Sequence, residues 1–233
     1  MPRPATDVGS EADRRPRAER LLPEKRRAQL LVAAVRAFSR GGITSTRHAD
    51  VAREAGTSPA TVFHYFPTRE TLVEVVVGEV ERMLSGFTES ATGPGVAPLE
   101  TLTRIAHGWD RAVDLQTDLA RIWLDWSTAV DDVLWTRYLA FYDWANALIA
   151  AAIERGQKSG DLRRDLHPED ASRIFLGAAY TVHQAKIRGA PNAEVDRIID
   201  GLIALFQSPG ALPVRRKNTR RAPRRQGKQA KTR

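Results

Sequence analysis

The side chains most able to make specific contacts lie in residues 47–66, which read RHADVAREAGTSPATVFHYF. After Gly56, small polar groups stand beside an imidazole and a phenyl ring. Hydroxyl and imidazole groups can bond to the edges of nucleic-acid bases, and small neighbours let the backbone come close to those edges. The residues that we expect to face such edges are Ser58, Pro59, Ala60, Thr61, Phe63 and His64. The alternative for Phe63 is a partly buried ring beside the helix expected over 24–40. The pattern favours recognition of a nucleic acid over bond-breaking chemistry.

Two short helices would position these groups. The first is expected from Arg47 to Ala55, with Gly56 as the turn that follows it. Pro59 suits the first turn of the second helix, because the N–H that it lacks would have no partner there. Val62 and Phe66, four residues apart, are expected to face the core, so the six residues above should face outward. This layout is typical of a helix-turn-helix, whose second helix enters the major groove of DNA.

Residues beside this motif could hold the phosphate backbone. Thr46, Arg47 and Thr68 stand at expected helix starts, where backbone N–H groups and the helix dipole favour phosphate. A basic cluster that leads into the first helix can grip the flanking backbone: Lys25, Arg26 and Arg27. The alternative for each of these residues is an ordinary solvated charged face.

Charge is distributed unevenly along the 233 residues, whose formal net charge is +8. Residues 1–69 hold 13 Lys/Arg and 7 Asp/Glu, residues 70–207 hold 13 and 21, and residues 208–233 hold 10 and none. A basic N-terminal part suits phosphate binding, whereas the acidic middle repels polyanions. Arg15 and Arg17 belong to a basic arm that can insert into a narrow minor groove. The basic tail could add non-specific affinity, bind an acidic partner or only improve solubility.

The apolar spacing predicts an all-α fold with an N-terminal three-helix DNA-binding domain and a longer C-terminal helical domain. Four domains are expected: a flexible basic arm (1–22), a helix-turn-helix domain (23–69), a helical regulatory and dimerisation domain (70–207) and a disordered basic tail (208–233). Beyond the motif, helices are expected over 24–40, 68–90, 98–116, 118–129, 131–158, 168–189 and 192–207.

At these residues the chain resembles the TetR family of transcriptional regulators. The resemblance rests on Ala55-Gly56-Thr57-Ser58, on the run from Thr61 to Phe66 and on the run from Thr68 to Leu72. It is closest to the quorum-sensing master-regulator branch of HapR- and SmcR-like proteins, which carry similar HAD-x-A and ATVF-x-YFPTRE stretches and a basic N-terminal arm. It weakens after residue 160, and the basic tail looks like an addition.

The resemblance implies a homodimer that binds a partly palindromic double-stranded operator. Tyr65 matches the family's phosphate-contacting tyrosine, and His48 falls in the stretch shared with the branch, so both are expected to contact DNA. A small hydrophobic effector would bind among the middle helices, and the two final helices would form a four-helix dimer interface. Family members commonly act as repressors, but this branch also activates, so the direction of regulation stays open.

The effector pocket is expected to be mostly apolar. Aromatic side chains gather between residues 109 and 144, and stripes of this kind on helices are more often core than ligand cage. Because the family resemblance implies a cavity among these helices, the residues expected to touch an effector are Trp109, Trp123, Trp126 and Phe141.

Several classes of protein are excluded or disfavoured. There is no cysteine, and the five histidines lack metal-ligand spacing, so no metal site or cofactor is expected. No nucleophile elbow or phosphate loop supports an enzyme with a vestigial head. No apolar run near 18 residues and no signal peptide are present, which favours a soluble, cytoplasmic protein away from membranes. The remaining rival is an architectural protein that coats DNA with little sequence preference.

Overall fold

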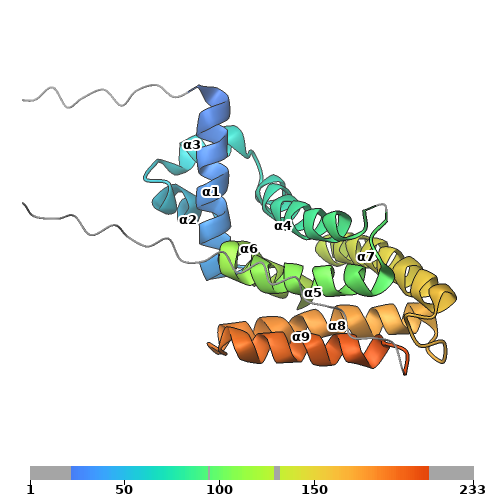
Figure 1. Cartoon of the computed structure of the whole chain (residues 1–233). Helices are drawn as coiled ribbons and strands as arrows, with labels where there is room; N and C mark the ends of the chain where they lie inside the picture. Colours follow the sequence, from blue (N-terminus) through green and yellow to red (C-terminus); the bar gives the residue numbers. More distant parts are fainter. Residues whose placement is uncertain (1–21, 94, 129–131, 210–233) are drawn as a thin grey trace, which may run out of the picture. The chain divides into compact units, whose positions relative to one another are not determined.

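The chain is all-helical over the residues that the computed structural model describes, which are 22–93, 95–128 and 132–209 (Figure 1). Within these ranges there are nine helices, and the β-structure is limited to an isolated bridge between Leu162 and Gln207. The predicted fold class is therefore confirmed. No helix in the described ranges is both long enough and apolar enough to cross a membrane.

The helix bounds follow proline and glycine signals. Pro23, Pro98 and Pro168 each occupy the first turn of a helix, and Gly42, with φ of 81°, follows the end of the first helix. The nine helices are α1 (Pro23–Gly41), α2 (His48–Glu54), α3 (Pro59–Tyr65), α4 (Arg69–Ala91), α5 (Pro98–Leu115), α6 (Thr117–Thr128), α7 (Asp132–Ser159), α8 (Pro168–Ile187) and α9 (Asn192–Phe206).

The described residues form two compact units. The first holds residues 22–81 with 118–128, and the second holds 82–117 and 132–209, without residue 94. The first unit thus includes the N-terminal half of α4 and nearly all of α6, which the sequence analysis assigned to the regulatory domain. Its core is built around Leu30, Phe38, Val51, Val62 and Phe66, each at most 1% exposed.

Two carboxylates attach α6 to the first helices within this unit. The Ser39 hydroxyl of α1 donates to Asp118 Oδ1 over 2.7 Å. The backbone N–H of Ile43, in the turn between α1 and α2, donates to Asp125 Oδ2. The guanidinium of Arg69 donates to the carbonyl of the same Ile43. Both the N–H and the carbonyl of Ile43 are therefore hydrogen-bonded, which holds the turn that leads into α2.

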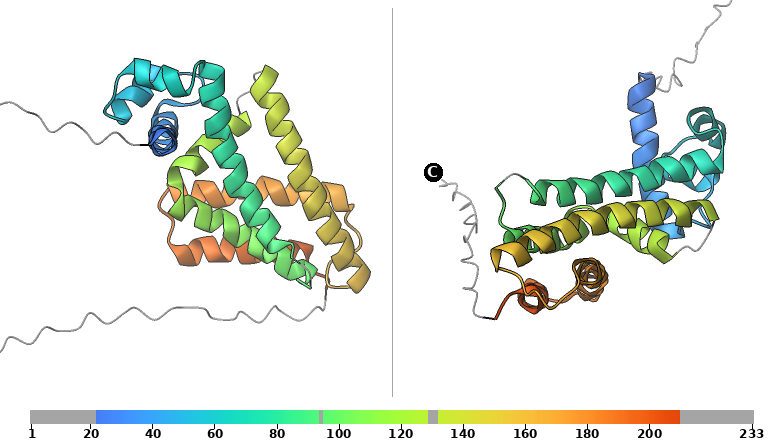
Figure 2. Two further views of the ribbon diagram at one scale, coloured as in Figure 1. Left: turned by 90° about the horizontal axis from the view of Figure 1, so that it is seen from above. Right: turned by 90° about the vertical axis from the view of Figure 1, so that its right-hand side faces the viewer.

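The second unit has its own core, which includes residues from α5, α7, α8 and α9. Phe175 is fully buried, and its ring meets those of Trp109 and Phe206 at 5.0 and 5.8 Å between centroids. Helices α8 and α9 lie side by side, as the right-hand view of Figure 2 shows along their axes. Lys186 of α8 reaches Asp110 and Asp114 of α5 at 2.9 and 2.8 Å, and these carboxylates raise its pKa against the opposing effect of burial.

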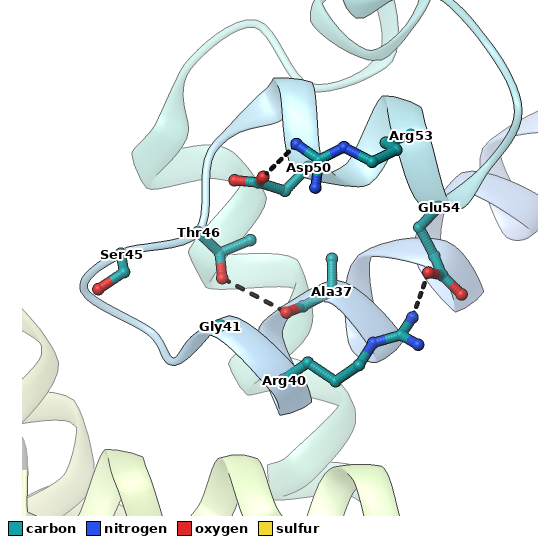
Figure 3. Close-up of a pocket in the computed structure, with 8 residues that line it drawn as sticks. All are labelled: Ala37, Arg40, Gly41, Ser45, Thr46, Asp50, Arg53 and Glu54. Atoms are coloured by element: carbon teal, nitrogen blue, oxygen red, sulfur yellow. Dashed lines mark hydrogen bonds and ion pairs between the residues drawn. The ribbon is translucent and has the colours of Figure 1, made fainter.

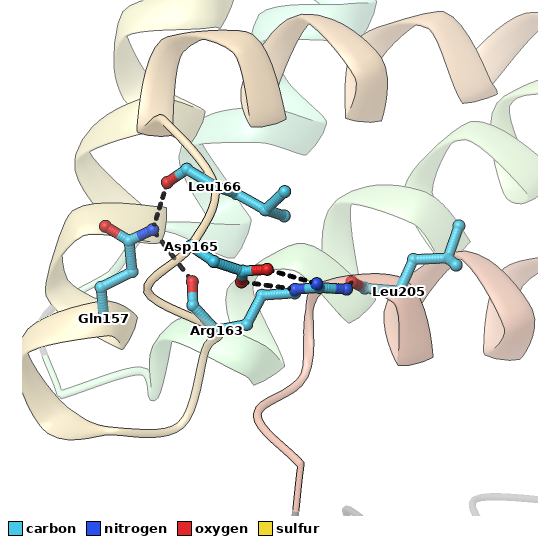
Figure 4. Close-up of polar contacts among 5 residues, drawn as sticks. All are labelled: Gln157, Arg163, Asp165, Leu166 and Leu205. Atoms are coloured by element: carbon cyan, nitrogen blue, oxygen red, sulfur yellow. Dashed lines mark hydrogen bonds and ion pairs between the residues drawn. The ribbon is translucent and has the colours of Figure 1, made fainter.

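A polar cluster fixes the loop between α7 and α8 (Figure 4). The Gln157 amide donates to the carbonyls of Arg163 and Leu166 at 3.0 and 2.8 Å. Arg163 pairs with Asp165, and its N–H groups also reach the last turn of α9, where the guanidinium bonds to the Leu205 carbonyl. These bonds satisfy backbone groups that the loop would otherwise leave unpaired.

Candidate nucleic-acid interface

Helix α3 begins where the sequence provides a cap and a proline. The Ser58 hydroxyl accepts the backbone N–H of Thr61 at 3.3 Å, and Pro59 occupies the first helical position. Such a cap satisfies one of the N–H groups that have no partner within the helix. The helix has only 7 residues and packs on the core with one side. On that side Val62, within the helix, and Phe66, just after it, are fully buried.

The opposite side of α3 faces solvent, as its spacing predicted. Ser58, Pro59, Ala60, Phe63 and His64 are exposed, while Thr61 and Tyr65 are half-buried. The His64 and Tyr65 rings meet edge to face at 5.0 Å between centroids. The predicted orientation of the helix is therefore confirmed, whereas contact of these residues with DNA stays a prediction.

Phe63 is positioned by the preceding helix. Its ring lies parallel to that of His48 in α2, with 3.8 Å between centroids and 8° between planes, and it remains 49% exposed. From the sequence this ring was expected either to contact DNA or to be partly buried beside the first helix; its stacking partner is instead His48 of α2. Because His48 covers one face of the Phe63 ring, the exposed part of that ring is the opposite face and the edge.

Two side chains expected to meet DNA are instead buried, which corrects the prediction for them. His48 is 5% exposed, and its Nε2 lies 2.8 Å from the Phe66 carbonyl, which can only accept a hydrogen bond. Thr46 is 2% exposed, and its hydroxyl donates to the Gly42 carbonyl at 2.8 Å. The backbone N–H of Thr46 donates to the same carbonyl, so it is not a free phosphate donor either.

The start of α2 is satisfied internally. The backbone N–H of Arg47 donates to Asp50 Oδ2 at 2.9 Å, which holds the pKa of that carboxyl below its usual value. This N–H is therefore not free for phosphate, contrary to expectation, but the Arg47 side chain is exposed and bonds to the Thr44 carbonyl. Thr68 is exposed and caps α4, because its hydroxyl accepts the N–H of Thr71 at 3.1 Å.

The basic cluster at the start of α1 is accessible to a polyanion. Lys25 and Arg27 are exposed, and the Arg27 guanidinium lies over the Phe66 ring at 5.3 Å from its centroid. Arg26 is half-buried and donates to Gln29 at 3.4 Å. The arm residues Arg15 and Arg17 lie outside the described residues.

A hollow opens between α1 and α2, as Figure 3 shows. Ionic groups on its lining pair with each other: Arg40 bonds to Glu54, and Arg53 bonds to Asp50 at 2.9 Å. Because their charges are neutralised in this way, the hollow offers little attraction to a charged ligand. The Arg40–Glu54 pair joins the end of α1 to α2, whereas the Arg53–Asp50 pair lies within α2.

Asp118, Asp125 and Arg69 support the interface and were not identified from the sequence. Asp118 bonds to Ser39, which is 79 residues away in the chain. Asp125 and Arg69 bond to Ile43, which is 82 and 26 residues away, respectively. Local spacing could not reveal partners at these separations. No group of three or more potential metal ligands occurs in the described ranges.

The four aromatic residues expected in an effector pocket fall in different units. Trp123 and Trp126 belong to the first unit, where Trp126 is fully buried. Trp109 and Phe141 belong to the second, where both are half-buried and pack on Phe175 and Trp144, respectively. Their role in binding an effector stays a prediction.

Comparison with known proteins places this geometry in context. Residues 30–76 match the family model described as bacterial regulatory proteins, tetR family. The chain is 30% identical over 193 residues to the HTH-type transcriptional regulator LuxR of Vibrio harveyi, which covers 83% of this chain and 94% of that protein.

Solved structures have the same fold. A TetR-like transcriptional regulator from Rhodococcus sp. RHA1 matches with a TM-score of 0.65 at 24% identity, over 80% of this chain and 96% of that one. AibR, solved in complex with isovaleryl coenzyme A and operator DNA, matches with a TM-score of 0.66 at 17% identity, over 79% and 99% of the two chains.

Proposed function

Because the chain belongs to the TetR family of bacterial regulatory proteins and is therefore a DNA-binding transcriptional regulator, we propose that it acts as a homodimer on a partly palindromic operator. Each protomer would place α3 in one major groove, and the distance between the two copies of α3 would set the half-site spacing. The observation that carries this proposal is the exposed side of α3, which is capped at Ser58 and supported by the buried Val62.

The residue types on α3 favour sequence reading over simple charge attraction. The helix, PATVFHY, contains no lysine or arginine, so it cannot act mainly as a phosphate clamp. Thr61 and His64 can exchange hydrogen bonds with base edges, and Ala60 allows close approach. An architectural protein with little sequence preference would be expected to carry cations on this face.

Cationic and polar groups around α3 would hold the phosphates. Lys25, Arg27 and Arg47 have exposed side chains, and Tyr65 and Thr68 lie at the end of α3 and just after it. Such contacts fix the register of a protein on the duplex without reading its sequence. Arg15 and Arg17 of the N-terminal arm would extend the contact into the minor groove.

Dimerisation through α8 and α9 is supported by apolar groups that the isolated chain leaves in solvent. Ile174 on α8 and Leu205 on α9 are each 60% exposed. Gly177 and Gly201 lie on the same exposed faces, and a methyl group at either position would meet nothing within 4 Å. Apolar and small residues on two adjacent helices suit a four-helix interface between protomers.

Control by a small hydrophobic effector completes the proposal. AibR is a relative by fold whose structure holds an acyl coenzyme A together with operator DNA. In this chain the half-buried Trp109 and Phe141 of the second unit are the groups we propose for an apolar effector. The 30% identity to LuxR supports a place in the branch that the motifs resemble, with target genes that respond to quorum sensing.

The test is selection of bound fragments from genomic DNA with the full-length protein, followed by affinity measurements on the selected site and on random DNA at ~150 mM salt. Specific binding at least about a thousandfold tighter than random binding is expected. Thr61→Ala and His64→Ala should each weaken specific binding by about 1–3 kcal/mol and relax base preference. Equal affinity for both DNAs would favour the architectural alternative, and an unchanged motif in both variants would exclude α3 as the reader.

The dimer is tested separately by sedimentation. Leu205→Glu would place a carboxylate in the proposed interface and should shift the protein toward monomer, whereas Leu115→Glu at the 74% exposed end of α5 serves as a matched control. A variant that stays as dimeric as the control would show that the protomers associate elsewhere.

A further inference from the structure

The exposed side of α3 carries an unusual side chain for a protein surface. Among the phenylalanine, tryptophan and tyrosine residues that the structure describes, Phe63 alone belongs to the strongly exposed group, with 49% of its surface accessible. Scattered aliphatic residues in solvent need no explanation, but an aromatic ring on the face proposed to meet DNA has a large apolar surface to cover.

The ring is held in one direction by a chain of contacts. His48 stacks on it at 3.8 Å, and His48 is itself 5% exposed. The Nε2–H of His48 donates to the Phe66 carbonyl over 2.8 Å, which fixes the plane of the imidazole. Phe66 is fully buried, with the Arg27 guanidinium over its ring. Thus one face of Phe63 rests on a rigid support, and its remaining surface is directed outward.

A phenyl ring has no hydrogen-bonding atom, so it cannot distinguish the donors and acceptors of base edges. The apolar group that the major groove offers is the C5-methyl of thymine. We propose that Phe63 determines specificity by packing on a thymine methyl group, and that His48 is the positioning residue that supports its ring. This inference rests on the proposed function, in which α3 lies in the major groove.

The assay replaces each thymine of the selected operator by deoxyuridine, one at a time, which removes the methyl and leaves the base pair intact. For the wild-type protein we expect the dissociation constant to rise about fourfold at one position in each half-site, since a buried methyl contributes about that factor. The measured quantity is the ratio of the dissociation constants for uracil and thymine DNA at that position.

Variants assign this ratio to a side chain. Phe63→Ala should bring the ratio to about 1, because the variant has no ring to contact the methyl. Thr61→Ala, which removes another methyl on the same helix, should leave the ratio at this position near its wild-type value. A ratio that falls in Thr61→Ala and persists in Phe63→Ala would overturn the assignment.

The positioning role of His48 is tested by two substitutions. His48→Gln keeps an N–H donor for the Phe66 carbonyl but has no ring, so the ratio should fall toward 1. His48→Phe keeps the stacked ring without the donor and should retain a ratio closer to that of the wild type. Partial unfolding raises both dissociation constants equally and cancels from the ratio. If both variants keep the wild-type ratio, His48 is only a structural residue and this part is overturned.

The scan also separates this inference from the proposed function. If the wild type prefers its selected site over random DNA but no uracil substitution weakens binding, the thymine contact is wrong and the proposed function stands. If the wild type shows no preference for any site, the proposed function itself fails.

Discussion

Replacing Asp125 with alanine should weaken the helix-turn-helix although residue 125 lies far from it in sequence. The Asp125 carboxylate on α6 accepts the backbone N–H of Ile43, a residue that is 0% exposed. In the Asp125→Ala variant, this N–H loses its partner where water has little access. The Arg69 guanidinium would still hold the Ile43 carbonyl, so the turn should loosen on one side only.

The expected loss follows from the type of bond. A hydrogen bond to a charged group contributes about 1.5–3 kcal/mol, and leaving a buried donor unsatisfied costs a comparable amount. We therefore expect the free energy of unfolding to fall by about 2 kcal/mol, which for a chain of this size lowers Tm by roughly 4–8 °C. Asp125→Asn keeps an acceptor oxygen without the charge and should lose about half as much.

Thermal melting followed by circular dichroism measures both variants. Asp143→Ala is the matched control, because Asp143 is an exposed carboxylate on α7, and it should change the free energy of unfolding by less than about 0.5 kcal/mol. If the Tm of Asp125→Ala equals that of the Asp143→Ala control, then the carboxylate of α6 does not stabilise the turn and the reasoning is wrong. Affinity for the selected operator should fall in parallel, since the turn leads directly into α2.

Three further outcomes follow from local geometry. Ser58→Ala removes the cap of α3 and should lower the free energy of unfolding by about 1 kcal/mol in urea titrations; an unchanged midpoint would argue against the cap. Gly156→Ala would place a methyl 2.5 Å from the Leu162 side chain and should destabilise by about 1–3 kcal/mol, whereas Gly86→Ala, with nothing within 4 Å, should not. Burial raises the pKa of Tyr138, and a hydrogen bond between Tyr138 and Tyr180 adds to this effect. The neutral phenol therefore stabilises the fold below about pH 10, and this stability is lost as the pH rises further. Tyr138→Phe should therefore lose less stability than the wild type between pH 9 and 11, and equal losses would contradict the assignment.

Most of the fold was predictable because its signals are local. Prolines in the first turns of α1, α3, α5 and α8 and the glycine after α1 determine where helices begin and end, and apolar spacing of 3.6 residues determines which side is buried. The outward side of α3 follows from Val62 and Phe66 in the same way. These predictions need only the few residues around each position.

The errors at Thr46 and His48 have a different cause. Both stand near the start of α2, where polar side chains commonly point to solvent or phosphate, and both instead turn inward to backbone carbonyls of Gly42 and Phe66. Spacing identifies the apolar side of a helix but not a polar side chain with a buried partner on another segment. The grouping of α6 with the DNA-binding helices was missed for the same reason, because Asp118 and Asp125 find their partners about 80 residues away.

The same limit explains why Phe63 was hard to interpret from sequence. Taken alone, an apolar ring on an outward helical position can equally be a misplaced core residue or a contact surface. The distinction depends on His48, whose ring stacks on one face of Phe63. The bond from His48 to the Phe66 carbonyl at the end of α3 holds the imidazole in place, and 49% of the Phe63 surface remains exposed to solvent. A buried polar residue of α2 thus positions an exposed apolar residue of α3, and we expect substitution of His48 by a residue without a ring to change the preference for thymine through Phe63.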